Sequence, residues 1–262
     1  MKRYLSLIAQ FASYSLKAEM EFRLNTLAYF VFSFLWVGTT YLVNVLVFSQ
    51  AGKVAGWTRQ EAWVLILIYY VTSTLIKNFV TPSMVAFIER VRKGELDFAL
   101  TKPVDPQFLI SIERMRIFTA SRGFIMFGLL VYYLNQLGIH VSFWQGTLTA
   151  VLAVFGMMGL YALYLFLATL SIWLENLWNL EDVFIEAMEL SKHPIDIYPS
   201  FIRNALIYVL PVVGISALPA MTLLGRLTPT LAISFSISSV VLFWLSRKFF
   251  QFALAQYRSA SS

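Results

Sequence analysis

Enzymes need nucleophiles, metal ligands or phosphate-binding loops at recognisable spacings, and this sequence offers few of them. The chain has no cysteine and two histidines, His140 and His193. It therefore contains no thiolate nucleophile, and His193 three residues before Asp196 is too small a set for a zinc site. The pair Gly52-Lys53 lacks the first glycine and the hydroxyl residue of a nucleotide-binding G-x-x-x-x-G-K-[ST] loop. We predict no catalytic residue, no metal site and no cofactor bound by this chain.

Carboxylates gather in the last third of the chain. They are Glu181, Asp182, Glu186 and Glu189, and positions 182, 186 and 189 share one face of a helix. Carboxylate oxygens are ligands for divalent cations. A set of this kind is more often the solvated face of a helix, and we favour that interpretation.

The most charged passage of the chain is Ile88 to Pro106, IERVRKGELDFALTKPVDP. Its pattern predicts a helix that ends at Gly94, because glycine readily adopts the left-handed cap conformation. A second short turn is expected from Glu95 to Leu100. Lys102-Pro103 and Asp105-Pro106 then favour an extended exit. We refer to residues 83–106 as the charged loop.

The charged loop could bind a soluble partner. Apolar side chains at Phe87, Leu96 and Phe98 stand among charged ones, a pattern suited to docking in a groove. The alternative is a solvated connector between two membrane spans. The pattern alone leaves both interpretations open.

The composition indicates the setting of these residues. Of the 262 residues, 59% are hydrophobic and 13% are charged, and there are 23 Phe, 13 Tyr and 7 Trp. Soluble domains carry about 25% charged residues. The net charge of +6 comes from basic residues beside apolar segments, which suits lipid headgroups and not nucleic acid. We predict an all-α polytopic membrane protein that forms one domain over residues 1–262.

Apolar runs predict the spans, since about 20 residues cross the hydrocarbon core. They lie at 27–48, 62–80, 117–136, 146–173 and 231–245. Residues 1–25 carry an apolar helical face and are predicted to form an interfacial helix, or else to extend the first span. Lys77, Asn78 and Arg122 lie in or beside spans. They either face a transport pathway or snorkel toward the membrane surface, and we favour snorkelling.

The region 174–226 has two interpretations. Hydropathy favours a proline-kinked fifth span at 206–224, after an acidic cytoplasmic helix at 174–203. The alternative places the fifth span at 174–193 and a re-entrant or broken element at 194–226. Lysine and arginine concentrate at the N-terminus, in the loop 82–116 and in the tail from Arg247. These parts are therefore predicted to be cytoplasmic, with six spans in total.

The chain resembles a known family in three places. These are Ala55-Gly56-Trp57 with Thr58, the element RKGELDFALTKP at 92–103, and the series Tyr198-Pro199, Arg203, Pro211, Pro219. Together they resemble the exporter-type (type 2) permeases of ATP-binding-cassette transporters, in particular an uncharacterised subfamily that pairs two permeases with one ATPase. The acid-rich segment 175–189 departs from that family and puts the position of the fifth span in question.

The resemblance implies a set of site residues. A coupling helix between spans two and three would contact the ATPase through Arg92, Lys93, Gly94, Glu95, Leu96, Asp97, Leu100, Lys102 and Pro103. Lys77, Asn78, Tyr198, Pro199, Arg203, Pro211 and Pro219 would have pathway or structural roles. The family also has an interfacial N-terminal helix and a re-entrant outer element near the fifth span.

The expected function follows from that resemblance. The chain would be a permease subunit of the bacterial inner (plasma) membrane, with both termini cytoplasmic, exporting an amphipathic or lipid-like substrate. Its partners would be an ATPase that holds ATP and Mg²⁺, a second permease (self or sister chain) and membrane lipid. The alternatives are a secondary transporter or channel driven by an ion gradient, and a membrane enzyme acting on lipid.

Overall fold

The computed structural model describes residues 2–174 and 179–257. These residues are almost entirely helical, with one small hairpin of β1 (Lys53–Val54) and β2 (Trp57–Thr58). Five helices are long and apolar enough to cross a membrane: Leu24–Ala51, Arg59–Lys93, Ile117–Gln136, Phe143–Ile172 and Pro229–Gln256. A sixth candidate is a helix pair bent by 73°. The prediction of an all-α polytopic membrane protein is confirmed at this level.

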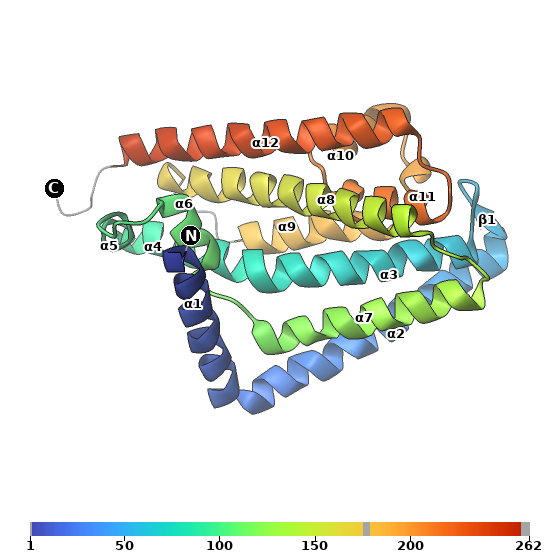
Figure 1. The fold of residues 1–262 in the computed structure, drawn as a ribbon, viewed down its shortest axis with the longest axis horizontal. Helices are drawn as coiled ribbons and strands as arrows, with labels where there is room; N and C mark the ends of the chain where they lie inside the picture. Colours follow the sequence, from blue (N-terminus) through green and yellow to red (C-terminus); the bar gives the residue numbers. More distant parts are fainter. Residues whose placement is uncertain (1, 175–178, 258–262) are drawn as a thin grey trace.

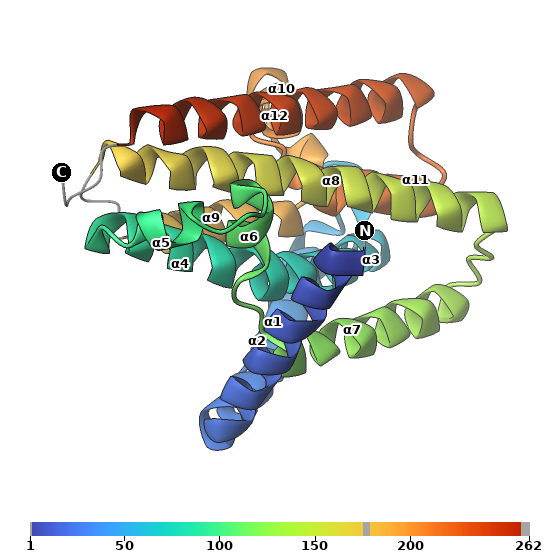
Figure 2. The same ribbon diagram turned by 60° about the vertical axis from the view of Figure 1, so that its left-hand side comes forward.

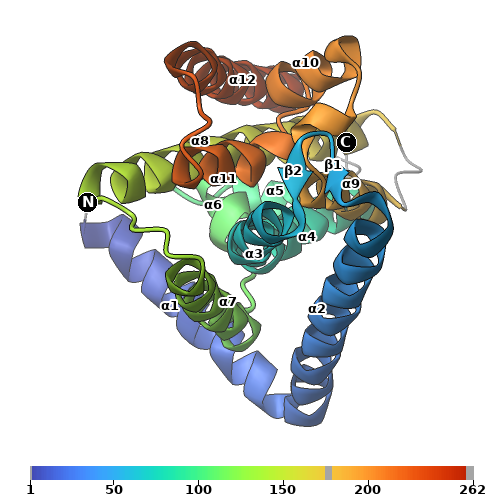
Figure 3. The ribbon, with the colours of Figure 1, turned by 90° about the vertical axis from the view of Figure 1, so that its right-hand side faces the viewer.

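The N-terminal helix lies across the bundle. Helix α1 (Lys2–Glu21) meets α2 (Arg23–Ala51) at a sharp elbow, and the two form one corner of the molecule (Figure 3). Ser15 Oγ accepts a hydrogen bond from the backbone N–H of Met115 at 3.2 Å. Leu5 and Ile8 remain exposed, as an interfacial helix requires of its lipid-facing side. Helix α2 packs little, since 11% of its apolar window is buried.

The most buried element of the bundle is one long helix made of three consecutive parts. They are α3 (Arg59–Leu75), a π-helix (Ile76–Val80) and α4 (Thr81–Lys93). A capping box between Thr58 and Glu61 begins it, and 72% of its apolar window is buried. The helix runs well beyond the predicted boundary at residue 80. Pro82 does not end it. It lies in the first turn of α4, directly after the π-helix, and the Asn78 carbonyl four residues before it accepts a hydrogen bond from the backbone N–H of Arg116 at 2.9 Å instead.

Beyond Lys93 the chain turns through two short helices. Helix α5 (Leu96–Leu100) is followed by α6 (Pro106–Ile112). As predicted, the short helix stops before Lys102-Pro103, and Asp105 is extended with φ −53° and ψ 121°; the exit is short, because α6 begins at Pro106. Asp105 caps that helix by accepting a hydrogen bond from the backbone N–H of Phe108 at 3.0 Å, and Pro106 occupies its first position.

Three further long helices complete the bundle. They are α7 (Ile117–Gln136), α8 (Phe143–Thr169, continued by a 3-10 turn Leu170–Ile172) and α12 (Pro229–Gln256). Helices α8 and α12 lie side by side (Figures 1 and 2). Ring pairs such as Tyr161–Phe243 and Phe166–Phe249 join them. Helix α12 continues past Arg247 and Lys248, where the sequence analysis ended the last span.

The last third is built from short helices. In chain order they are α9 (Leu180–Glu189), 3-10 turns at Leu190–Lys192 and Ile195–Ile197, α10 (Ser200–Tyr208), a 3-10 turn at Val213–Ile215 and α11 (Ala217–Leu223). Helix α9 lies between α3 and α8, whereas α10 and α11 lie toward the hairpin end (Figure 1). Helices α10 and α11 belong to the bent pair noted above.

The segment 196–226 begins and ends at the same end of the bundle. Trp57 Nε1 donates to Asp196 Oδ2 at 2.9 Å, and Arg226 contacts Glu61 Oε1 at 2.5 Å. Between these anchors the chain enters the bundle, where Pro211 lies against Gly159 near the middle of α8. Small residues permit this approach, since any Cβ on Gly159 would lie 2.7 Å from the Pro211 ring.

Candidate functional site: a buried ion-pair network and the charged loop

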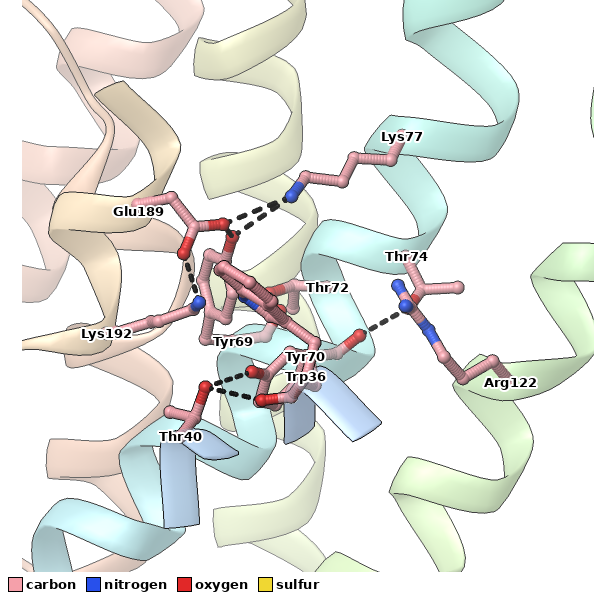
Figure 4. Close-up of polar contacts among 10 residues, drawn as sticks. All are labelled: Trp36, Thr40, Tyr69, Tyr70, Thr72, Thr74, Lys77, Arg122, Glu189 and Lys192. Carbon is pink, nitrogen blue, oxygen red and sulfur yellow. Dashed lines mark hydrogen bonds and ion pairs between the residues drawn. The ribbon is translucent and has the colours of Figure 1, made fainter. Parts of the chain in front are cut away.

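A cluster of partly buried charged side chains lies among the apolar helices, centred on Glu189 (Figure 4). The side chain of Lys77 is 27% exposed and that of Glu189 is 33% exposed. Glu189 Oε1 accepts a hydrogen bond from Tyr69 OH at 2.7 Å and one from Lys77 Nζ at 3.2 Å. Its second oxygen pairs with Lys192. One carboxylate thus serves two ammonium groups and a phenol, and we call Tyr69, Lys77, Glu189 and Lys192 the buried network.

Two elements position this network. Helix α3 and the π-helix carry Tyr69 and Lys77 eight residues apart, so both face α9. Glu189 ends α9, and Lys192 follows in the next 3-10 turn. Lys192 has 9% of its side chain exposed, and its Nζ lies 5.2 Å from the Tyr69 ring centre and 5.3 Å from that of Tyr70. Aromatic faces stabilise such a desolvated cation.

Hydrogen bonds extend the contacts to neighbouring helices. Tyr70 OH and Thr40 Oγ1 lie 2.7 Å apart and join α3 to α2. The guanidinium of Arg122, on α7, donates to Thr74 Oγ1 at 3.1 Å. Figure 4 shows these side chains converging on α3 from both sides. A displacement of α3 would therefore alter contacts with α2, α7 and α9 together.

The sequence analysis favoured snorkelling for the polar residues of the second and third spans. In the structure, these side chains instead contact neighbouring elements of the bundle. Lys77 turns inward to Glu189. Asn78 donates to Thr74 O at 2.7 Å and accepts from Thr119 Oγ1 at 2.5 Å, so it joins the π-helix to α7. Ionisable groups at this depth generally mark functional or strongly structural positions.

The carboxylates of α9 do not form one cluster. Glu189 faces the buried network, whereas Asp182 and Glu186 are exposed. Within the described residues, no group of three or more His, Asp or Glu side chains is placed to hold a metal ion. Glu175 lies outside the described residues.

Sequence reasoning missed Tyr69 and Lys192 as partners of Glu189. The available signal was the presence of Lys77 in an otherwise apolar span, because a buried cation requires an anion. The spacing of Glu189 and Lys192, three residues apart in a segment with helical character, was a second signal.

The charged loop projects at the end of the bundle opposite the hairpin (Figure 1). Gly94 ends α4 with φ 69° and ψ 20°, so the predicted left-handed cap is confirmed. The exposed residues of the coupling series are Arg92, Lys93, Glu95, Lys102 and Pro103, while Asp97 and Leu100 are half-buried. These exposed side chains present both positive and negative charges to a partner.

The apolar residues expected to contact a partner are instead internal. Phe87 and Leu96 each have 0% of their surface exposed, and the Phe87 ring packs edge-on against Phe250 of α12 at 5.8 Å. This part of the hypothesis is wrong, because their partners are the chain's own helices. The side chain of Phe98 lies outside the described residues. Leu96 therefore positions α5 and is not part of its outer surface.

Ion pairs fasten the charged loop to the bundle. Arg247 on α12 pairs with Asp105 at 2.8 Å and donates to Gln107 Oε1 at 3.0 Å. Gln107 in turn donates to Tyr161 OH on α8 at 3.0 Å. Burial alone would raise the pKa of Asp105, but the Phe108 N–H and the Arg247 guanidinium outweigh it and hold the pKa below its ordinary value.

The residues of the Tyr-Pro and proline series lie in separate places. Tyr198 OH donates to Leu190 O at 3.4 Å, and Arg203 pairs with Asp196 at 3.4 Å. Pro199 precedes the first residue of α10. Pro211 packs on Gly159, whereas Pro219 lies in α11 and lines an apolar groove of about 680 Å³ bounded by α3, α7, α8 and α11. They shape the 196–226 segment and do not form one site.

Comparison with known proteins gives one family. A family model described as "ABC-2 family transporter protein" matches residues 34–261. The matched part contains the buried network, the charged loop and the whole of the last third. No curated protein matches the chain.

Proposed function

Because the chain belongs to the ABC-2 family of transporter proteins, we propose that it is a permease subunit powered by a separate ATPase docked on the charged loop. The observation that carries this proposal is the form of that loop. Exposed Glu95 and Lys102 flank the short helix α5 at one end of the bundle, while buried Leu96 fixes α5 to the core. A fixed projection of mixed charge suits recognition by a soluble protein.

The long central helix links the docking surface to the buried network. Helix α4 enters the charged loop, and the same continuous helix carries Lys77 and Tyr69. The contacts of Arg247 and Tyr161 fasten α6 to α12 and α8. We infer that movement of the loop on ATP binding by the partner moves α3 against α9 and rearranges the contacts of Glu189.

Membrane topology is part of the proposal. We infer that the part of the chain that contains α9 supplies the fifth span and that 194–226 is re-entrant. This is the second of the two arrangements considered from the sequence, 174–193 for the span, of which residues 175–178 lie outside the described residues. Support comes from the two anchors at the hairpin end, Asp196 on Trp57 and Arg226 on Glu61. The charged loop and both termini are then cytoplasmic, in an inner membrane, as the lysine and arginine distribution favours.

A second permease, either another copy or a sister chain, would cover the polar face of α9. Asp182 and Glu186 are exposed on this single chain, and an aspartate facing lipid at a helix centre costs about 2.5–3.5 kcal/mol. A pathway between two permeases would keep these carboxylates in water or in protein. A pathway wall that carries both charged side chains and aromatic rings suits export of an amphipathic or lipid-like substrate.

The test is copurification of an ATPase with the tagged chain, coexpressed with its genomic neighbours. We expect the reversals Glu95→Lys and Lys102→Glu, made together, to release the ATPase, because both side chains are exposed on the loop. Lys53→Glu at the opposite end is the matched control and should retain it. A chain that purifies without an ATPase, or that retains it after the reversals, contradicts the proposal.

The buried network favours one further candidate, a carrier driven by an ion gradient. Charged residues that pair within a membrane bundle are typical of proton and ion relays. That candidate predicts transport in vesicles that contain the chain alone and an imposed gradient, whereas the permease proposal predicts none without ATP and the ATPase.

A further inference from the structure

A second cavity lies at the elbow between α1 and α2. Its volume is about 390 Å³, and its walls come from α1, α2, the π-helix and α7. Three of its lining residues are cationic, Lys77, Arg116 and Arg122, and one is acidic, Glu19. Lys77 is paired with Glu189. The cavity therefore depends on its two arginines for its remaining positive charge.

Neither of these arginines forms a direct ion pair within residues 2–174 and 179–257. Among the described residues, Arg122 donates to Thr74 Oγ1 alone, at 3.1 and 3.3 Å, although a guanidinium has five N–H donors. In the part of the chain that the structure describes, no carboxylate lies within ion-pair distance of Arg116 or Arg122. An uncompensated guanidinium in an apolar span is costly, so the position of Arg122 calls for an anion from outside the chain.

Glu19 is the carboxylate among the lining residues of this cavity. Its Oε2 accepts a hydrogen bond from the backbone N–H of Phe118 at 2.7 Å, whereas its Oε1 is buried and has no partner among the described residues. Burial raises the pKa of Glu19 against the opposing backbone hydrogen bonds of Phe118 and Ile117.

The surroundings of the cavity are apolar. Tyr29 and Phe30 line it from α2. The neighbouring outer faces carry Leu27 on α2, 51% exposed, and Phe124 on α7, 82% exposed. A molecule that fits both parts has an anionic head and a hydrocarbon tail.

We propose that this cavity binds the phosphate-bearing headgroup of an anionic membrane lipid. Arg122 and Arg116 contact the phosphate oxygens, as arginine forks do for phosphate, and the acyl chains follow the exposed faces of α2 and α7. The site is separate from the charged loop and does not depend on the proposed ATPase coupling. A soluble phosphate offers the same anionic oxygens without the hydrocarbon, so the experiment must separate the two sources.

Native mass spectrometry of the purified full chain tests this site. The protein is titrated with phosphatidylglycerol and, separately, with phosphatidylcholine of identical acyl chains. We expect about tenfold tighter binding of phosphatidylglycerol, and loss of this preference in Arg122→Gln, because charge-assisted hydrogen bonds disappear. Arg116→Gln at the exposed mouth should weaken the preference without affecting folding. Arg122→Lys keeps the charge and should keep part of the preference.

Lys248→Gln is the matched control, since Lys248 is an exposed cation outside the cavity, and its preference should equal that of the native chain. Equal binding of the two lipids by the native chain overturns the proposal. A preference for phosphatidylglycerol that is unchanged when Arg122→Gln and Arg116→Gln are combined overturns it as well. Displacement of phosphatidylglycerol by millimolar inorganic phosphate assigns the cavity to a soluble anion and overturns the choice of a lipid.

Discussion

Glu189 is the one carboxylate that the buried network uses, and it neutralises Lys77 and Lys192 together. Removing its charge would leave two ammonium groups close to Tyr69 inside the bundle. Such groups repel each other and lose charge-assisted hydrogen bonds, which contribute about 1.5–3 kcal/mol each. The network therefore holds α9 against α3 only while Glu189 is ionised.

We predict that Glu189→Gln lowers the free energy of unfolding by about 1.5–3 kcal/mol. Thermal unfolding of the detergent-purified variant measures the change. Glu186→Gln, three residues earlier on the same helix, changes an exposed carboxylate and should leave the unfolding midpoint nearly unchanged. Equal effects of the two substitutions would contradict the assigned role of Glu189.

At the scale of single residues, the sequence shows which side chains are apolar or charged, but it does not show which other residues they contact. The apolar character of Phe87 and Leu96 was clear, but an amphipathic pattern does not say which surface covers the apolar side. Here the covering surface includes α12, about 160 residues further along the chain. The same limit applies to Lys77, because its anion at position 189 is distant in sequence.

Among the structural elements, the 194–226 segment depends on close packing against α8 and α12. Gly214 lies so near Phe235 that an added Cβ would be 2.2 Å from a ring carbon. A side chain there requires the ring or the backbone to move. The segment is therefore sensitive to small increases in volume at this position.

We predict that Gly214→Ala destabilises the protein by about 1–3 kcal/mol through overpacking. Gly128→Ala in α7 is the control, because an added Cβ there has nothing within 4 Å and alanine is a better helix former by up to about 1 kcal/mol. Unfolding midpoints in detergent compare the two. An unchanged midpoint for Gly214→Ala would show that the packing is looser than described.

Helix α6 gives a prediction that depends on pH. The pKa of Asp105 lies below its ordinary value of 3.8, so its stabilising contribution is complete above that value. The contribution is lost as the pH falls through the lower pKa of the folded state. Asp105→Asn keeps the helix cap and removes the charge that pairs with Arg247.

We therefore expect Asp105→Asn to lower stability by about 0.5–1 kcal/mol at pH 7, since the pair is partly exposed. Below about pH 4 the difference from the native chain should shrink as native Asp105 becomes protonated. Thermal unfolding across this pH range is the measurement. A difference that stays constant with pH would mean that the Arg247 pair contributes nothing.

At the scale of the whole molecule, the two arrangements of the last third differ in the side on which Ser200 lies. The chain has no cysteine, so single cysteines can be introduced without removing others. In the re-entrant arrangement Ser200 lies on the side of Lys53, and Lys102 lies on the opposite side. In the arrangement with a span at 206–224, Ser200 lies on the side of Lys102.

We predict that Ser200→Cys and Lys53→Cys react with an impermeant maleimide added outside intact cells, and that Lys102→Cys reacts only after permeabilisation. Labelling of Ser200→Cys together with Lys102→Cys would contradict the re-entrant arrangement. The Lys53→Cys and Lys102→Cys variants are the controls for the two sides.

The sequence predicts the helical class and the approximate positions of the five long apolar helices, because each has a long apolar run with few charged residues. It does not decide the course of 174–226. Hydropathy measures the free energy of transfer out of water, and by this measure 206–224 is the more apolar part of the region. In the structure, these residues belong to a helix pair bent by 73°. The two ends of the 196–226 segment pair with residues near the hairpin, Asp196 with Trp57 and Arg226 with Glu61, and hydropathy does not register such pairing.

The two anchors of the 196–226 segment also bear on the order of assembly. A span becomes fixed when its ends are separated by the bilayer, so it must be placed as the chain is inserted. In the re-entrant arrangement proposed above, the segment enters and leaves at one face and needs no such transfer, so it can join a bundle whose spans already exist. We therefore expect α10 and α11 to fold late and, on unfolding, to open as one cooperative unit before the long helices separate.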